Sequence, residues 1–238
     1  CSGLTNLNVS SFDTTNVTST AFMFADCTAL PSLNVSSFNT SSVTTMYSMF
    51  ARCRSAESIY IDKTKFITSQ VTNMGAMFGD CQSLTSVELS GFDTSEVTSM
   101  AFMFMRCWSL GSLDLSKFVT TKVELWDHML SNCWKLTSMN VNMLDTSAAT
   151  NMEGMFEYNP QLTVLDLSNF DTSNVTNMRY MFKDCTGLES IIVSEGDDKW
   201  TTAAVDLTNN SDGVNGGTDM FLNCTSRSEE HTSELQSQ

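Results

Sequence analysis

Cysteine recurs along the 238-residue chain at a nearly constant interval, and this repeat constrains the fold more than any other feature. The cysteines are Cys1, Cys27, Cys53, Cys81, Cys107, Cys133, Cys185 and Cys224, which lie 26, 26, 28, 26, 26, 52 and 39 residues apart. The interval of 52 is two units, with Asn159 where a cysteine is due. Extra residues fall at 62–65 and, as an irregular insertion, near 195–218. The chain therefore consists of eight units, 1–26, 27–52, 53–80, 81–106, 107–132, 133–158, 159–184 and 185–223, and the start of a ninth.

We call these units repeats 1 to 8 and count positions in each from its cysteine. Positions 7 and 9 are apolar between polar neighbours, as in Leu33 and Val35, which predicts a strand with one buried face. Positions 20, 23 and 24, such as Met46, Met49 and Phe50, have helical spacing over too short a run for an independent helix. We therefore expect one short helical or 3₁₀ turn per unit, after a second, very short strand near positions 17 and 18.

A unit of this size cannot bury its own apolar positions, so neighbouring units must stack to form a continuous core. The sequence thus predicts an α/β repeat fold with parallel strands, extended as a solenoid.

Two motifs carry a family resemblance. The pattern Leu-x-x-Leu-x-Leu is typical of leucine-rich-repeat strands, and residues 170–185 read Phe-Asp-Thr-Ser-Asn-Val-Thr-Asn-Met-Arg-Tyr-Met-Phe-Lys-Asp-Cys. This run resembles the BspA-type leucine-rich repeats of bacterial and protist surface proteins, and the likeness covers residues 1–194 and 220–224. The resemblance implies a right-handed leucine-rich-repeat solenoid that serves adhesion or protein recognition outside the cell or at its surface. It implies no catalytic residues.

Composition limits the partners. The chain contains 12 Lys and Arg residues and 27 Asp and Glu residues, which gives a formal charge of -15. This negative charge disfavours binding to nucleic acid or anionic membranes. No apolar run is long enough to span a membrane, and no phosphate-binding loop, His-Glu-x-x-His or Gly-x-Ser-x-Gly motif occurs. We expect no enzymatic activity and no cofactor. The expected partner is a protein or a cell-surface ligand, and the alternative is a passive spacer within a larger surface protein.

The last twelve residues break the repeat. Residues 227–237 correspond codon by codon to the translation of a common short-read sequencing adapter. We therefore expect 227–238 to be a non-native disordered tail, and 1–226 to be a single solenoid without caps, from a metagenomic fragment.

The cysteines are predicted to be structural. Stacked coils place equivalent residues about 4.8 Å apart, whereas a disulfide needs β-carbons about 3.8 Å apart. Buried free thiols are therefore favoured, with disulfides as the alternative, and Asn159 would bond the neighbouring backbone. The predicted ladder contains Cys27, Cys53, Cys81, Cys107, Cys133, Asn159 and Cys185.

Candidate binding residues are aromatic or acidic. Trp108 and Trp134 share position 2 of neighbouring repeats and are expected to lie side by side, near Phe102 and His128 at position 22. Such an aromatic pair is a candidate hot spot. The alternative is that both indoles cover the core edge where repeat 5 departs from the consensus. On the exposed strand face, position 8 adds Tyr60, Glu88 and Asp114.

Two weaker hypotheses concern calcium and ice. Asn210, Asp212 and Asp219 fall at ligand positions of a calcium loop aligned on Gly213, although Thr208 stands where the first Asp would be. Threonine also fills position 14 of the first seven repeats and position 18 of six of them. A flat threonine array could order water as in ice-binding solenoids, but corner turns are the simpler explanation.

Overall fold

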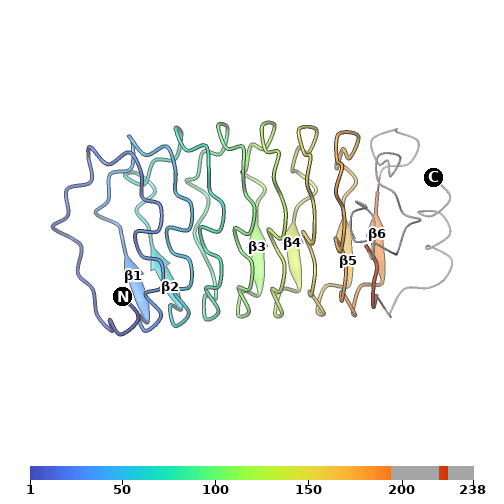
Figure 1. Ribbon diagram of the computed structural model, residues 1–238, viewed down its shortest axis with the longest axis horizontal. Helices are drawn as coiled ribbons and strands as arrows, with labels where there is room; N and C mark the ends of the chain where they lie inside the picture. Colours follow the sequence, from blue (N-terminus) through green and yellow to red (C-terminus); the bar gives the residue numbers. More distant parts are fainter. Residues whose placement is uncertain (194–219, 225–238) are drawn as a thin grey trace.

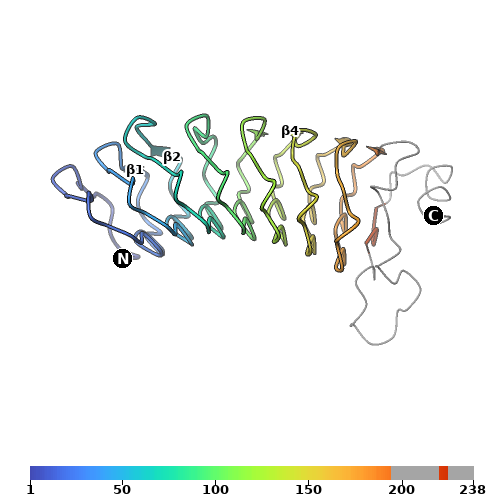
Figure 2. The ribbon, with the colours of Figure 1, turned by 90° about the horizontal axis from the view of Figure 1, so that it is seen from above.

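Successive repeats form coils that lie side by side from the N-terminus toward the C-terminus (Figure 1). The computed structural model describes residues 1–193 and 220–224. Seen from above, each coil follows the one before it along the same axis (Figure 2). The chain therefore has the repeat architecture that its cysteine spacing predicts.

Six three-residue strands lie at the predicted strand positions. They are β1 (Ser32–Asn34), β2 (Ser58–Tyr60), β3 (Ser112–Asp114), β4 (Ser138–Asn140), β5 (Val164–Asp166) and β6 (Ser190–Ile192). They pair in parallel as β1 with β2, β3 with β4, and β5 with β6, with equivalent residues opposite one another. The central residue points inward, as Leu33 does between exposed Ser32 and Asn34. The predicted parallel strands are thus confirmed in these repeats.

A second line of pairing runs along position 19. Single-residue parallel bridges join Ser19 to Thr45 and continue coil by coil to Asn177. These bridges lie one residue beyond the very short strand expected at positions 17 and 18.

The predicted helical turn is wrong, because the described residues contain no helix. In repeat 1, Phe22 and Asp26 have positive φ values of 59° and 61°, a left-handed conformation that interrupts any helix. The N–H groups of Phe22, Phe24 and Asp26 donate instead to carbonyls of repeat 2, at 2.9–3.0 Å. The N–H groups between them bond carbonyls three residues back, as Met23 N does to Thr20 O at 3.1 Å. Helical spacing of the apolar residues therefore reflects a series of tight turns in which bonds to the next coil alternate with bonds within the coil.

The core consists of columns of equivalent side chains. Phe24, Phe50, Phe78 and Phe104 at position 24 stack with ring centroids 5.8, 5.6 and 5.4 Å apart. Repeat 5 departs from this pattern, with fully buried Trp126 at position 20 and Leu130 at position 24. A larger residue at one position and a smaller one nearby conserve core volume. The Trp126 indole N–H donates to the carbonyl of Val123 at 3.0 Å, so its polar atom is satisfied.

The cysteine ladder is buried, and its thiols are free. From Cys53 onward, each ladder thiol donates to the position-24 carbonyl two repeats earlier, as Cys53 Sγ in repeat 3 does to Phe24 O in repeat 1 at 3.2 Å. Asn159 does the same through Nδ2, at 2.8 Å from Leu130 O, and its Oδ1 accepts from the N–H of Cys133 at 2.9 Å. Burial raises the pKa of Cys53, Cys133 and Cys185 to about 12, which suppresses the reactive thiolate at neutral pH.

The threonines at position 14 are buried in all seven repeats where they occur, at Thr14, Thr40, Thr68, Thr94, Thr120, Thr146 and Thr172. Thr68, for example, donates to Asp93 O and accepts from Asp93 N, both at 2.8 Å. This row therefore cannot face ice. The threonines at position 18 are exposed, but Thr98 Oγ1 lies 3.3 Å from the carbonyl of Thr72 in the preceding coil.

Two sequence-based predictions fall outside the described residues. These are the calcium loop with Asn210, Asp212 and Asp219, and the tail at 227–238.

Candidate binding surface

The acidic residues predicted on the strand face close local turns. Glu88 Oε1 accepts from the N–H of Ser90 at 2.8 Å, and Asp114 Oδ1 accepts from Ser116 at 2.9 Å. Hydrogen bonds to these serines hold the pKa of both carboxyls below the usual range. Because the bonds satisfy the backbone two residues on, both side chains have a structural role. Tyr60 at the end of β2 remains exposed.

The two tryptophans form a stacked pair. Trp108 and Trp134 have ring centroids 4.8 Å apart and an interplanar angle of 7°. Trp134 is 48% exposed, whereas Trp108 is half-buried. Trp108 Nε1 is buried without a hydrogen-bond partner. A buried donor without an acceptor costs free energy.

Phe102 and His128 form a second stacked pair, at 5.3 Å and 17°. Both have positive φ, at 61° and 51°. The next residue in this column is Gly154, where an added Cβ would lie 2.3 Å from His128 Nδ1. Glycine at this position thus leaves room for the imidazole to reach over the following coil.

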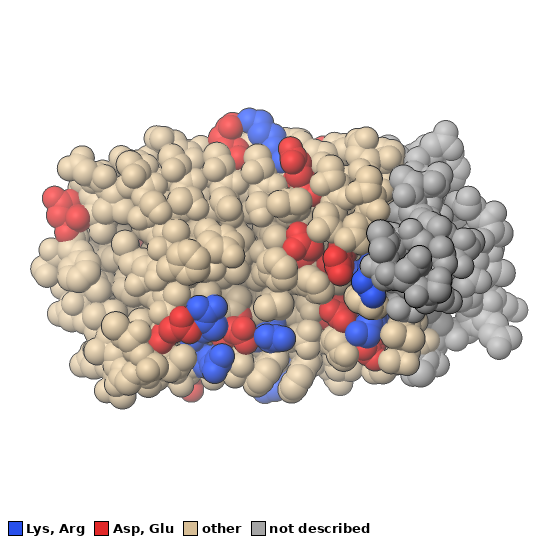
Figure 3. All heavy atoms as spheres, in the orientation of Figure 1, with Lys and Arg blue, Asp and Glu red and all other residues tan. Residues whose placement is uncertain are grey.

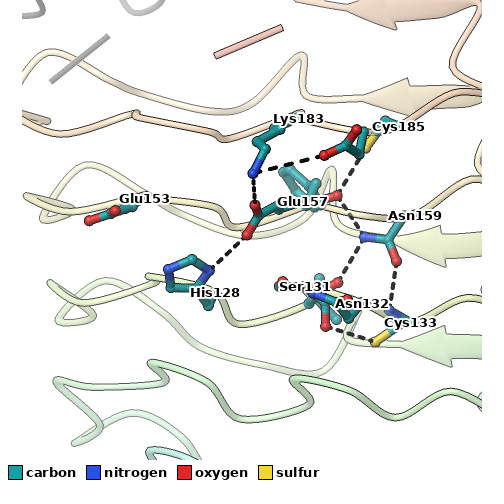
Figure 4. A network of polar contacts seen from close by, with 12 residues as sticks. His128, Ser131, Asn132, Cys133, Glu153, Glu157, Asn159, Lys183 and Cys185 are labelled. Carbon is teal, nitrogen blue, oxygen red and sulfur yellow. Dashed lines mark hydrogen bonds and ion pairs between the residues drawn. The ribbon is translucent and has the colours of Figure 1, made fainter. Parts of the chain in front are cut away.

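His128 belongs to a polar network that crosses repeats 5, 6 and 7 (Figure 4). Its Nδ1 lies 3.4 Å from Glu157 Oε2, and Lys183 Nζ lies 3.1 Å from Glu157 Oε1. Glu157 is buried. Burial raises the pKa of Glu157, but hydrogen bonds from His128 and Lys183 together with the lysine charge lower it below its ordinary value. Lys183 also lies over the rings of Tyr158 and Tyr180, at 5.1 and 4.6 Å.

Sequence reasoning missed this network. Its signal lies in position 25, which is uncharged in the first five repeats and then becomes Glu157 and Lys183 in succession. Opposite charges at the same position of stacked coils predict an ion pair. Asp26 and Arg52 at position 26 follow the same rule, at 2.6 Å.

The structure brings together some of the predicted binding residues. Trp108 contacts Trp134 and Phe102 contacts His128, but no ring stacking joins the two pairs within the described residues. Tyr60, Glu88 and Asp114 share position 8, where Glu88 and Asp114 each bond a serine of their own coil. Charged side chains gather in a few groups on the face in Figure 3, with broad uncharged areas between them.

The described residues contain neither a group of three or more potential metal ligands nor a helix that could cross a membrane.

Stacked coils with parallel pairing of equivalent residues define the chain as a repeat protein. It belongs to the family described as "Mycoplasma protein of unknown function, DUF285", which matches residues 2–60, 54–158 and 127–229. Three overlapping matches agree with an architecture in which one unit recurs along the chain. No curated protein matches the chain.

Proposed function

We propose that the chain is a non-catalytic binding module of the BspA type. In this proposal the coils form a right-handed leucine-rich-repeat solenoid that binds a protein or cell-surface ligand outside the cell or at its surface. Parallel pairing of equivalent residues supports a continuous solenoid, and the repeat family supports the architecture.

The observation that carries the proposal is the tryptophan pair. Trp134 exposes about half of its surface, and Trp108 holds it in a fixed orientation. Rigid, exposed aromatic side chains are the residues that most often dominate binding energy, because they bury a large area at low entropic cost.

The alternative, a passive spacer, also has specific support. Many polar side chains on the surface bond the backbone of their own or a neighbouring coil, as Glu88 and Asp114 do. A surface whose polar side chains bond the backbone of the chain itself can hold other domains apart without binding a ligand.

A binding screen separates the two functions. The purified chain is applied to an immobilised panel of extracellular-matrix proteins and glycans, beside the variants Trp134→Ala and Tyr47→Ala. Tyr47 is a matched control, because it is also an exposed aromatic residue, in repeat 2. We expect saturable binding to at least one component, weakened at least tenfold by Trp134→Ala and unchanged by Tyr47→Ala. A spacer would show no saturable binding, and equal loss in both variants would exclude the tryptophan pair as the site.

A further inference from the structure

Given the binding function proposed above, on which this inference rests, we propose that the surface around the tryptophan pair binds an acidic polysaccharide. Sugar rings pack against Trp134, and acid groups bind the neighbouring cations. The surface is the corner formed by position 26 of one repeat and positions 1 to 3 of the next, which we call the junction corner. Trp108 and Trp134 occupy position 2 in it and are stacked with ring centroids 4.8 Å apart.

Cations outnumber carboxylates at the junction corner, although the chain as a whole has a formal charge of -15. The five junctions between repeats 1 and 6 contain four cations and two carboxylates, namely Arg52, Arg54, Arg106 and Lys135 with Asp26 and Asp80. Exposed Glu57, at position 5, reduces this excess without cancelling it. Because salt screens charges more than about 8–10 Å away, the local excess acts on an anion here more strongly than distant carboxylates do.

Arg54 and Lys135 are the cations most accessible to a ligand. Both are exposed, and neither forms an ion pair within the described residues. Arg106 lies 3.7 Å from Asp80 with its side chain 51% exposed, and exposed ion pairs of this kind are weak enough for another anion to compete. Arg52 differs, because two hydrogen bonds of 2.6 and 2.7 Å hold it to the carboxylate of the preceding repeat.

The spacing of these cations favours a polymer. Arg54 belongs to repeat 3, Arg106 to repeat 4 and Lys135 to repeat 6. At about 4.8 Å per coil, the first and last lie about 14 Å apart along the stack. A chain with acid groups on successive units can contact all three, whereas a single acid group would have to draw the side chains together at an entropic cost. Trp134 precedes Lys135 directly, so the same polymer meets the indole.

The rest of the junction corner is polar, which favours a sugar polymer over a protein. Apart from the two tryptophans, positions 2 and 3 of repeats 3 to 6 contain only polar or charged residues, namely Arg54, Ser55, Gln82, Ser83, Ser109 and Lys135. Protein partners bury aromatic hot spots at the centre of an interface that excludes water and is depleted of charge. A polysaccharide instead offers hydroxyl groups to serine and glutamine, and C–H groups to the electron-rich face of an indole.

Calorimetric titration with heparin tests the proposal, beside two other polymers. Dextran is a polysaccharide without acid groups, and poly-L-glutamate is acidic without sugar rings. We expect saturable binding of heparin, none of dextran, and binding of poly-L-glutamate that is at least tenfold weaker. Arg54→Gln/Lys135→Gln and Trp134→Ala should each weaken heparin binding at least tenfold.

The matched control is Lys63→Gln/Lys117→Gln, which removes the same charge from two exposed lysines outside the junction corner and should bind heparin like the wild type. Circular dichroism confirms that each variant is folded, and the single variants Arg54→Gln and Lys135→Gln replace the double one if it unfolds. The proposal is overturned by absence of saturable heparin binding, by poly-L-glutamate that binds as tightly as heparin, or by equal losses in the two double variants. Heparin binding that Trp134→Ala retains would also overturn it, because the cations would then act alone.

The immobilised panel separates this proposal from the binding function itself. A matrix protein that binds the wild type but not Trp134→Ala, while heparin does not bind, would overturn the polysaccharide and leave the binding module in place. If neither heparin nor any component of the panel binds, both proposals fail.

Discussion

Thr94 lies buried between two coils, where its hydroxyl donates to Val119 O at 2.9 Å and accepts from Val119 N at 2.8 Å. One side chain thus satisfies both backbone polar groups of a single residue in the next repeat. Thr98, four residues on, is exposed, and its hydroxyl bonds a carbonyl that already accepts the N–H of Thr98 itself. At the scale of single residues, the same amino acid therefore has an essential role at one position and a dispensable one at another.

Replacing Thr94 with valine should lower the free energy of unfolding by about 1–3 kcal/mol, because it leaves the part-buried N–H and carbonyl of Val119 without their hydroxyl partner. Thr98→Val should change it by less than about 0.5 kcal/mol, since Thr72 O keeps its bond from the Thr98 N–H at 2.8 Å. Urea unfolding of both variants measures the difference. Equal losses in the two variants would contradict the role given to position 14.

Left-handed backbone at position 22 gives a second prediction at this scale. Ala76 has a φ of 52°, a conformation that costs a residue with a Cβ about 1–2 kcal/mol. Ala76→Gly should raise the free energy of unfolding by about 0.5–1 kcal/mol, after the entropy cost of glycine. Ala51 is buried and is not among the residues with positive φ, so Ala51→Gly should be destabilising. Thermal unfolding compares the two, and a loss of stability in Ala76→Gly would argue against the turn conformation.

Among the structural elements, the strands were predictable from sequence and the turns were not. Alternation at positions 7 and 9 matches β1 to β6, because a strand with one buried face leaves that pattern, but repeats 1 and 4 carry the same alternation without a strand. Positions 20–24 carry helical spacing, yet the N–H groups at positions 20, 22 and 24 bond the neighbouring coil. Spacing reports which side chains are buried, and it does not report where the backbone hydrogen bonds go. Trp108 and Trp134 could be paired by comparing repeats, and Glu157 could have been found in the same way.

The turn segments of repeats 5 to 7 are joined by Glu157, which gives a prediction for pH dependence. The pKa of Glu157 is lowered from 4.5 in the folded chain, so its stabilising contribution is present above about pH 4.5 and is lost as pH falls through the lower folded value. At pH 5.5 Glu157→Gln should be less stable than the wild type by about 1–3 kcal/mol. Urea unfolding measures the difference in free energy of unfolding between the two proteins, which should become smaller from pH 5.5 to pH 3. A difference that stays constant would contradict the role of Glu157 in the network.

Across the whole molecule, coils are held together by contacts between residues about 26 positions apart. Columns of phenylalanine, methionine, threonine and cysteine continue from one repeat to the next, so each coil is stabilised mainly by its neighbours. The stacked coils thus form a rigid support for the tryptophan pair, in which Trp134 is the exposed member. The 26-residue repeat in the sequence was sufficient to predict that the coils stack. The direction of the hydrogen bonds between coils could be determined only from the structure.

Residue-resolved amide hydrogen exchange tests the central claim, that backbone hydrogen bonds run between coils. In repeats 2 to 6, N–H groups at positions 20, 22, 24 and 26 donate across the interface, whereas those at positions 23 and 25 donate to carbonyls three residues back in the same coil. We expect slow exchange at positions 20, 22, 24 and 26 of each of these repeats. Met46, Ser48, Phe50 and Arg52 are the expected protected set in repeat 2. A helix beginning at Met46 would leave its first four N–H groups without intrahelical partners, so fast exchange at Met46 and Ser48 would contradict the account.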